Sequence, residues 1–159
     1  MAADRAALRM FDTVKEYLDS NNYRYQDIDL KNDELALSAT FSGDDLPMRL
    51  LLIVSPSREL VRIRSWLPFE CPKDKMAIMA IAVCIANYGL MRGTFDLDIS
   101  DGSIGYRLSQ SYHDCLVGPA QIGKMMADAL HWIEKYNDSF QMLSQGSISL
   151  EQFNQMENS

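Results

Sequence analysis

The densest group of chemically capable side chains in this sequence is His113-Asp114-Cys115. A thiol beside an imidazole is the pattern of a nucleophile with its general base, and all three side chains can ligate metals. A closed zinc site would need further ligands from Cys71 or His131, but their positions show no ligand-pair spacing. A nucleophile would also need an orienting group and oxyanion donors, which nothing in the sequence supplies. We therefore expect a polar loop here, with no catalytic and no metal-binding residues.

A second polar cluster, from Asp96 to Gly102, has the spacing of oxygen ligands in a calcium-binding loop. An EF-hand loop beginning at Asp96 requires glycine at its sixth position and glutamate at its twelfth. This chain has Asp101 and Arg107 there, so the register fails. No glycine-rich phosphate loop precedes a helix either. We expect no cofactor.

The cluster is better explained as the turn of a β-hairpin. Apolar residues alternate with Thr94, Asp96 and Asp98 on one arm, and Ser100-Asp101-Gly102-Ser103 supplies a turn that tolerates positive φ. Alternation at period two on both arms predicts one apolar and one polar face. The apolar residues of the two arms are Phe95, Leu97, Ile99, Ile104, Tyr106 and Leu108.

The segment before the hairpin predicts a helix. Met76 to Ala86 is an unbroken apolar run, Pro72 suits the first turn, and Gly89 or Gly93 can end it. The run is far shorter than the roughly 20 apolar residues of a membrane span. We therefore expect a core helix that is buried on most sides, with Cys84 inside, and no membrane span.

The remaining periodicities predict further strands and helices. Ala2 to Asn21 and Pro119 to Leu143 have helical spacing, and Gly146 ends the second of these helices. Four strands lie between the first of these helices and the central helix, and Pro68 closes the fourth strand. The expected order is α-β-β-β-β-α-β-β-α, an α+β domain in which helices pack on an antiparallel sheet. The strands are expected at 23–30, 34–42, 48–54 and 60–67.

The composition limits the possible partners and locations. The chain has 159 residues, 47% of them hydrophobic, and a formal net charge of -7. This length favours one domain, expected over residues 1–146, followed by a tail at 147–159 that is a short helix capped by Ser149 or loose. The negative charge disfavours nucleic acid. Three unpaired cysteines and a first helix without a signal-peptide core predict a cytoplasmic protein with reduced thiols.

A resemblance to a known family rests on ten residues in and before the expected hairpin: Asn87, Gly93, Phe95, Leu97, Asp98, Asp101, Gly102, Ile104, Tyr106 and Arg107. The central motif of YbjN-like proteins, described as bacterial sensory transduction regulators, is similar to ten residues of this chain, and the likeness extends over about residues 10–146. It implies the type III secretion chaperone-like fold, whose members are often acidic dimers that bind protein segments. It supplies no catalytic residues.

One face of the expected sheet is a candidate interface. If Arg49 points away from the core, period two places Leu51 and Ile53 on the same outer face. Trp66 lies on the face of its own strand that carries Arg62 and Arg64. Large aliphatic side chains on an open sheet face indicate a covering partner. The cover is the tail, a second copy of the chain or a bound protein segment.

The same face is expected to be charge-paired. Arg62 and Arg64 share the outward parity of their strand, and Asp96, Asp98 and Arg107 share it in the hairpin. Opposite charges on neighbouring strands contribute about 0.2–1 kcal/mol for each pair.

Two functions remain open at this point. The first is a non-catalytic interaction module, chaperone-like or regulatory, that acts as a homodimer. The alternative is a small-ligand sensor or an enzyme with a pocket between a helix and the sheet. The missing catalytic constellation favours the first.

Overall fold

The computed structural model describes residues 2–159, with side chains from residue 5 onward. Its centre is a six-stranded antiparallel sheet with the strand order β1-β2-β3-β4-β6-β5. The elements are α1 (Ala2–Ser20), β1 (Tyr25–Ile28), β2 (Leu35–Phe41), β3 (Met48–Ser55), β4 (Leu60–Glu70), a 3-10 turn η1 (Lys73–Lys75), α2 (Met76–Tyr88), β5 (Thr94–Leu97), β6 (Ser103–Ser111), α3 (Pro119–Gln145) and α4 (Leu150–Glu157). The predicted α+β class is confirmed.

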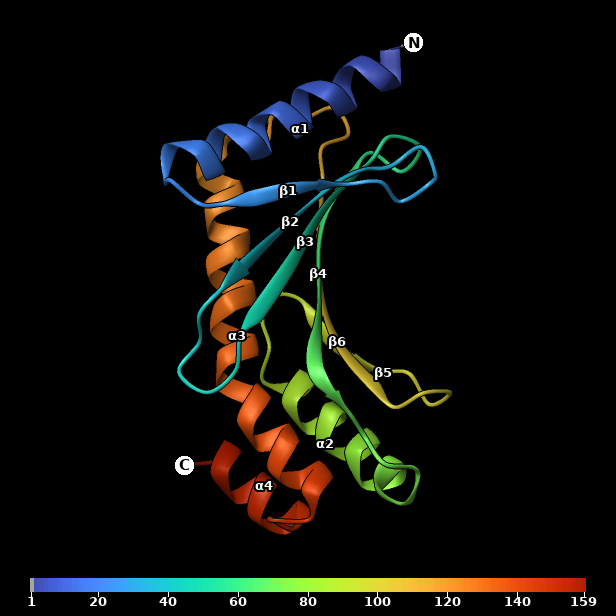
Figure 1. The fold of residues 1–159 in the computed structure, drawn as a ribbon, viewed down its shortest axis with the longest axis vertical. Helices are drawn as coiled ribbons and strands as arrows, with labels where there is room; N and C mark the ends of the chain where they lie inside the picture. The colour runs from blue at the N-terminus through green and yellow to red at the C-terminus, as the bar shows by residue number, and fades with distance from the viewer. Residues whose placement is uncertain (1) are drawn as a thin grey trace.

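The helices lie on one side of the sheet. Figure 1 shows α3 running along the sheet, with α1 near one end and α2 and α4 near the other. Alternate residues of the strands point toward these helices and form one continuous core. We call this side the inner face and the opposite side the outer face. Inner-face residues of the two central strands include Leu50, Leu52, Val54, Val61, Ile63 and Leu67.

The fourth strand is longer than the sequence suggested. β4 continues through Pro68 to Glu70, whereas Pro68 was expected to close it. Between Trp66 and Glu70 its pairing with β6 is irregular, and a proline without an N–H donor is tolerated at such a place. In the hairpin, β5 ends at Leu97, and Ile99 is 77% exposed in the turn rather than on the apolar face.

The expected burial of α2 is wrong on one side. Met79, Ala82, Val83 and Ala86 are buried, but the opposite side of the helix, including Cys84, is exposed. A helix that is apolar on every side has no polar face to mark the side exposed to solvent. Periodicity therefore could not predict which side of α2 is exposed.

The tail forms a helix that joins the core. Ser149 caps α4 by accepting a hydrogen bond from the Gln152 amide, as expected for a tail that is helical. Phe153 is fully buried and stacks on Phe140, with ring centroids 5.5 Å apart. α4 contacts α2 and α3, so it lies on the inner side. The tail is therefore not the cover of the outer face.

Candidate interaction surface

The candidate interface residues lie together on the outer face. Arg49, Leu51 and Ile53 point outward from β3, and Arg62, Arg64 and Trp66 point outward from β4. The antiparallel register places Leu51 opposite Arg64 and Ile53 opposite Arg62. No helix among residues 2–159 covers this side of the sheet.

Their exposures differ more than the period-two pattern suggested. Trp66 is 48% exposed, but Ile53 is only 5% exposed. Ile53 has Ala36 and Arg62 as its cross-strand neighbours, and the Arg62 side chain extends over this part of the face to reach Glu34. Leu51 and Trp66 therefore offer apolar surface to a partner, whereas Ile53 is already covered within the chain.

An apolar groove surrounds Leu51 and Trp66. It has a volume of about 460 Å³ and crosses the outer face from β1 to β4. Four of its residues were not among the interface residues expected from the sequence. For three of them the reason is local: β1 is short, and the two prolines lie where strand pairing begins or becomes irregular. The groove is lined by Ile28, Thr40, Pro47, Arg49, Leu51, Trp66 and Pro68.

A second depression, the arginine pocket, lies beside the groove on the same face. It has a volume of about 390 Å³. The turn between β3 and β4 contributes Arg58, while β4, β5 and β6 contribute the other charged groups. The pocket is lined by Arg58, Leu60, Arg62, Ile63, Arg64, Asp96, Arg107 and Ser109.

The expected charge pairing on this face is confirmed for Asp96. Its carboxylate accepts a hydrogen bond from Arg64 at 2.9 Å and lies 3.5 Å from Nε of Arg107. Gly105 of β6 lies between these strands, and a Cβ there would be 2.8 Å from Asp96 Oδ1. The missing side chain lets the carboxylate reach across β6. Asp98 does not join this network, because it lies beyond the end of β5 and accepts hydrogen bonds from Ser100.

Arg62 pairs with a carboxylate that the sequence did not indicate. Glu34, just before β2, accepts hydrogen bonds from Ser55 and Arg62. Burial raises the pKa of Glu34, but the hydrogen bond from Ser55 and the charge of Arg62 outweigh it, so the pKa lies below its ordinary value. Glu34 is therefore ionised at neutral pH. Its position before the strand gave no periodic signal.

A third exposed surface is the outer side of α2, which sequence reasoning placed in the core. Ile81 is 51% exposed and Tyr88 is 96% exposed. Ala77, Ile81, Cys84 and Tyr88 follow one another at spacings of four, three and four residues, so they share one side of the helix. The sequence between Met76 and Met91 contains no charged residue. We call this surface the α2 stripe.

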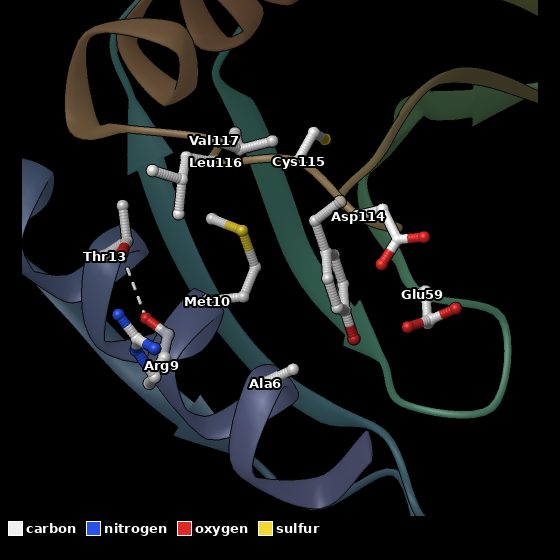
Figure 2. Close-up of a pocket in the computed structure, with 10 residues that line it drawn as sticks. Ala6, Arg9, Met10, Thr13, Glu59, Asp114, Cys115, Leu116 and Val117 are labelled. Atoms are coloured by element: carbon white, nitrogen blue, oxygen red, sulfur yellow. Dashed lines mark hydrogen bonds between the residues drawn. The ribbon is translucent and has the colours of Figure 1, made fainter. Parts of the chain in front are cut away.

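A cleft lies between α1 and the segment before α3. Figure 2 shows Met10 beside Leu116 and Val117, with Glu59 and Asp114 on the far side. The cleft has a volume of about 470 Å³ and opens to solvent. Its polar groups come from distant parts of the chain, including Arg9 and Thr13 of α1. The lining residues are Ala6, Arg9, Met10, Thr13, Glu59, Tyr112, Asp114, Cys115, Leu116 and Val117.

The cleft does not assemble the nucleophile pair considered for His113-Asp114-Cys115. Nδ1 of His113 bonds to Glu59, and its Nε2 lies 3.5 Å from Asp114. Cys115 instead donates to the Ser111 carbonyl at 3.3 Å. The hydrogen bond to Glu59, then the charges of Glu59 and Asp114, raise the pKa of His113. The imidazole is thus paired with carboxylates.

The described residues, 2–159 for the backbone and 5–159 for the side chains, contain neither a metal-binding cluster nor a membrane-spanning helix. No group of three or more His, Cys, Asp or Glu side chains is placed to hold a metal ion in this part of the chain. None of the helices described is both long and apolar enough to cross a membrane.

Comparison with known proteins identifies the fold. No family model matches the sequence, and no curated protein matches it. A chain in the structure of the HopA1–SchA chaperone–effector complex is similar with a TM-score of 0.59 and 15% identity, over 84% of this chain and 97% of that one. YbjN from E. coli, described as a candidate transcription regulator, is similar with a TM-score of 0.55 and 12% identity, over 81% and 92%. The chaperone-like and YbjN-like fold expected from the resemblance is confirmed.

Proposed function

We propose that this chain is a non-catalytic protein-interaction module, chaperone-like or regulatory, that holds a segment of another protein on its outer face. The observation that carries this proposal is the apolar groove around Leu51 and Trp66 on a sheet face that no described helix covers. Exposed apolar surface of this kind is typical of interaction sites. Tryptophan and arginine, both present in the groove, are enriched among residues that dominate binding energy.

The structural neighbours support a binding role over a catalytic one. One of them comes from a chaperone–effector complex, and the other is described as a candidate regulator. Neither description names an enzyme. The thiol of Cys115 and the imidazole of His113 also have separate partners here.

We also propose that the module is a homodimer and that its two-fold contact is the α2 stripe. The stripe has the alternating three- and four-residue spacing with which two helices pack along a seam. Ala77 and Ala80 on its exposed side allow close approach. A chain with net charge -7 repels its own copies, but this stripe has no charge of its own and adds no local repulsion to that.

Selection of binding peptides tests the interaction role. A random 12-residue phage-displayed library is panned on the immobilised protein, and the selected peptides are measured by fluorescence anisotropy. We expect binding to weaken about tenfold or more with Trp66→Ala or Leu51→Ala, as for central interface residues. Unchanged circular dichroism and melting temperature show that the fold is intact. Failure to select peptides, or binding indifferent to both variants, contradicts the proposal.

Light scattering on a size-exclusion column tests the dimer. We expect a mass near twice the 18.1 kDa of the chain at tens of micromolar. Ile81→Glu places a charge in the α2 stripe and should yield a folded monomer. Leu51→Glu is the matched variant on the outer face and should leave the dimer intact. If Leu51→Glu dissociates the dimer and Ile81→Glu does not, the two-fold contact is the outer face.

The α1 cleft favours a small-ligand sensor as the second candidate function. Arg9 offers a donor, Glu59 and Asp114 offer acceptors, and Met10 offers an apolar surface in one open cavity. The Thr13 hydroxyl, which donates to the Arg9 carbonyl, can still accept. A ligand that binds only the native protein raises its melting temperature. A metabolite screen by thermal shift, repeated with Arg9→Ala, tests this function. A shift that disappears with Arg9→Ala supports it, and no shift across the screen argues against it.

A further inference from the structure

We infer that the segment bound by the outer face is acidic as well as apolar. Its large apolar side chains would occupy the groove, and its Asp or Glu carboxylates would occupy the arginine pocket. This inference rests on the proposed function, because it specifies the chemistry of the partner. It depends on the distribution of charge over the outer face and on the continuity of the two depressions.

The outer face concentrates arginine in an acidic chain. Five of the nine arginines line the groove or the arginine pocket, and none of the six lysines does. The chain as a whole carries a net charge of -7. Arginine differs from lysine in presenting a planar fork of donors that matches a carboxylate. The positive charge is therefore placed on this face in the form best suited to recognise carboxylates.

The carboxylates on the same face leave part of this charge unneutralised. Asp96 is shared between Arg64 and Arg107, so one negative charge serves two positive ones. Glu34 pairs with Arg62. Arg49 donates to the Ser38 hydroxyl at 2.8 Å, which brings no charge. The residues that line the two depressions therefore carry five positive charges against the one negative charge of Asp96, so an incoming carboxylate would meet more positive than negative charge there.

The groove and the pocket are parts of one surface. Trp66 lines the groove, Arg64 lines the pocket, and the guanidinium carbon of Arg64 lies 4.9 Å from the centre of the Trp66 ring. Both residues also line a further depression, which extends over β5 and the turn that follows it. From Arg62 to Pro68 the strand advances about 20 Å at the usual rise per residue. An extended segment of about six to eight residues therefore spans both.

The arginines of the outer face and the net negative charge of the chain argue against two other occupants, a second copy of the chain and a nucleic acid. A second copy packed face to face would bring a second set of five arginines into the same contact, because an isologous contact uses the same patch on both copies. A nucleic acid would be repelled by the negative charge of the rest of the chain and would leave the apolar groove unused. An extended segment satisfies both depressions when an apolar and an acidic side chain are separated by an even number of residues, because both then point toward the same face.

The peptides selected on the wild-type protein test the inference. We expect them to be enriched in Asp and Glu at two, four or six residues from Trp, Leu, Phe or Ile. Replacing the acidic residues of one selected peptide by Gln and Asn should weaken its binding about tenfold or more, as for loss of charge-assisted hydrogen bonds. Arg107→Glu should weaken the original peptide by a similar factor. Lys124→Glu, the same charge change on α3, should change it less than twofold. Binding should also weaken with added salt.

The outcomes separate the inference from the proposed function. Peptides that require Leu51 and Trp66 but have no acidic preference, and bind Arg107→Glu normally, overturn the inference and leave the function standing. If no peptide depends on the outer face, both fail. A fluorescent single-stranded DNA 20-mer is the competing polyanion. If it binds as tightly as the peptides and displaces them, the surface selects negative charge in general, and the inference is wrong.

Discussion

The two faces of the same sheet are used differently, and β4 shows this residue by residue. Ile63 and Leu67 point inward and are almost fully buried, whereas Arg64 and Trp66 point outward, with Trp66 48% exposed. Buried apolar surface stabilises by about 25 cal/mol per Å². The inner face therefore supplies the stability of the fold, which leaves the outer face free to carry residues chosen for binding. Substitutions on the two sides should separate these roles.

The largest loss of stability is expected for Phe153→Ala, at the far end of the inner side. Phe153 is fully buried and packs against the rings of Tyr136 and Phe140. Truncation of a buried phenylalanine costs about 3–5 kcal/mol, because apolar contact is lost and a cavity remains. Urea denaturation of the full chain should show this loss. Met156→Ala on the same helix, 45% exposed, is the control and should cost less than about 1 kcal/mol.

The same experiment bears on the domain boundary. If residues 1–146 fold alone, as the sequence suggested, deleting residues 147–159 leaves a cooperative transition. The burial of Phe153 leads us to expect the opposite: the deletion should destabilise the fold at least as much as Phe153→Ala. If the truncated protein unfolds at the wild-type urea midpoint, α4 does not contribute to the stability of the domain.

The sequence predicted the inner side of this protein well because burial leaves a periodic signal. The apolar run around Leu50 and the alternation around Ile63 identified the central strands, and Gly146, at φ 74°, ends α3 where expected. Period-two alternation also predicted that Arg49, Leu51, Arg64 and Trp66 point outward.

Sites formed by residues from several helices or strands were not predictable in the same way. The groove needs Ile28 and Pro47 beside Trp66, which are far apart in the chain and meet only through the strand order. The α2 stripe could not be separated from the core side of the helix, because both are apolar. Glu34 was missed because its partners, Ser55 and Arg62, lie on two other strands.

A smaller loss is expected on the outer face from Glu34→Gln. The carboxylate bonds to Ser55 and Arg62, and both members of the ion pair are mostly shielded from solvent. Removing the charge should cost about 1–2 kcal/mol at pH 7, the scale of a hydrogen bond to a charged group. Urea denaturation against wild type measures it. A cost as large as that of Phe153→Ala would contradict the assignment of stability to the inner face.

The pH dependence of the same pair has a definite sign. The pKa of Glu34 is lower in the folded protein than its ordinary value of 4.5, so folding favours the ionised form. Its stabilisation is therefore present above about pH 4.5 and is lost as pH falls through the lower folded pKa. Glu34→Gln should lose this part of the acid sensitivity. If both proteins lose stability equally between pH 5 and 3, Glu34 is not responsible.

Two cysteines allow the same substitution, Cys→Ser, to be compared at a buried and an exposed position. Cys71 is buried at the end of β4, and burial raises the pKa of its thiol, whereas Cys84 is exposed in the α2 stripe. Cys71→Ser should cost about 1 kcal/mol, because it buries a hydroxyl among apolar groups. Cys84→Ser should change the free energy of unfolding by less than about 0.5 kcal/mol. Thermal denaturation under reducing conditions measures both. Both substitutions are made in the Ile81→Glu background, so that the proposed dimer contact over Cys84 does not contribute. A larger cost for Cys84→Ser than for Cys71→Ser there would contradict the exposure of Cys84 in the single chain.

The smallest effect is expected at His113, which is largely exposed beside the α1 cleft. The hydrogen bond to Glu59 raises the pKa of the imidazole above its ordinary value of 6.5, so the folded state favours the protonated form. Stabilisation from this contact is fully present below about pH 6.5 and is lost as pH rises through the folded pKa. This direction is opposite to that of Glu34. NMR titration of the imidazole signals measures the pKa, with His113→Asn to assign them.

Glu59→Gln separates this contact from the other charges near His113. The variant removes the carboxylate but keeps a side chain of the same size, and Asp114 remains 3.5 Å from Nε2. Because the hydrogen bond to Glu59 is the main cause of the shift, the pKa of His113 should return most of the way to its ordinary value. Peptide binding at the outer face should not change, because neither residue lines the groove or the arginine pocket. An unchanged pKa would assign the shift to Asp114, and altered peptide binding would show that the inner and outer sides are coupled.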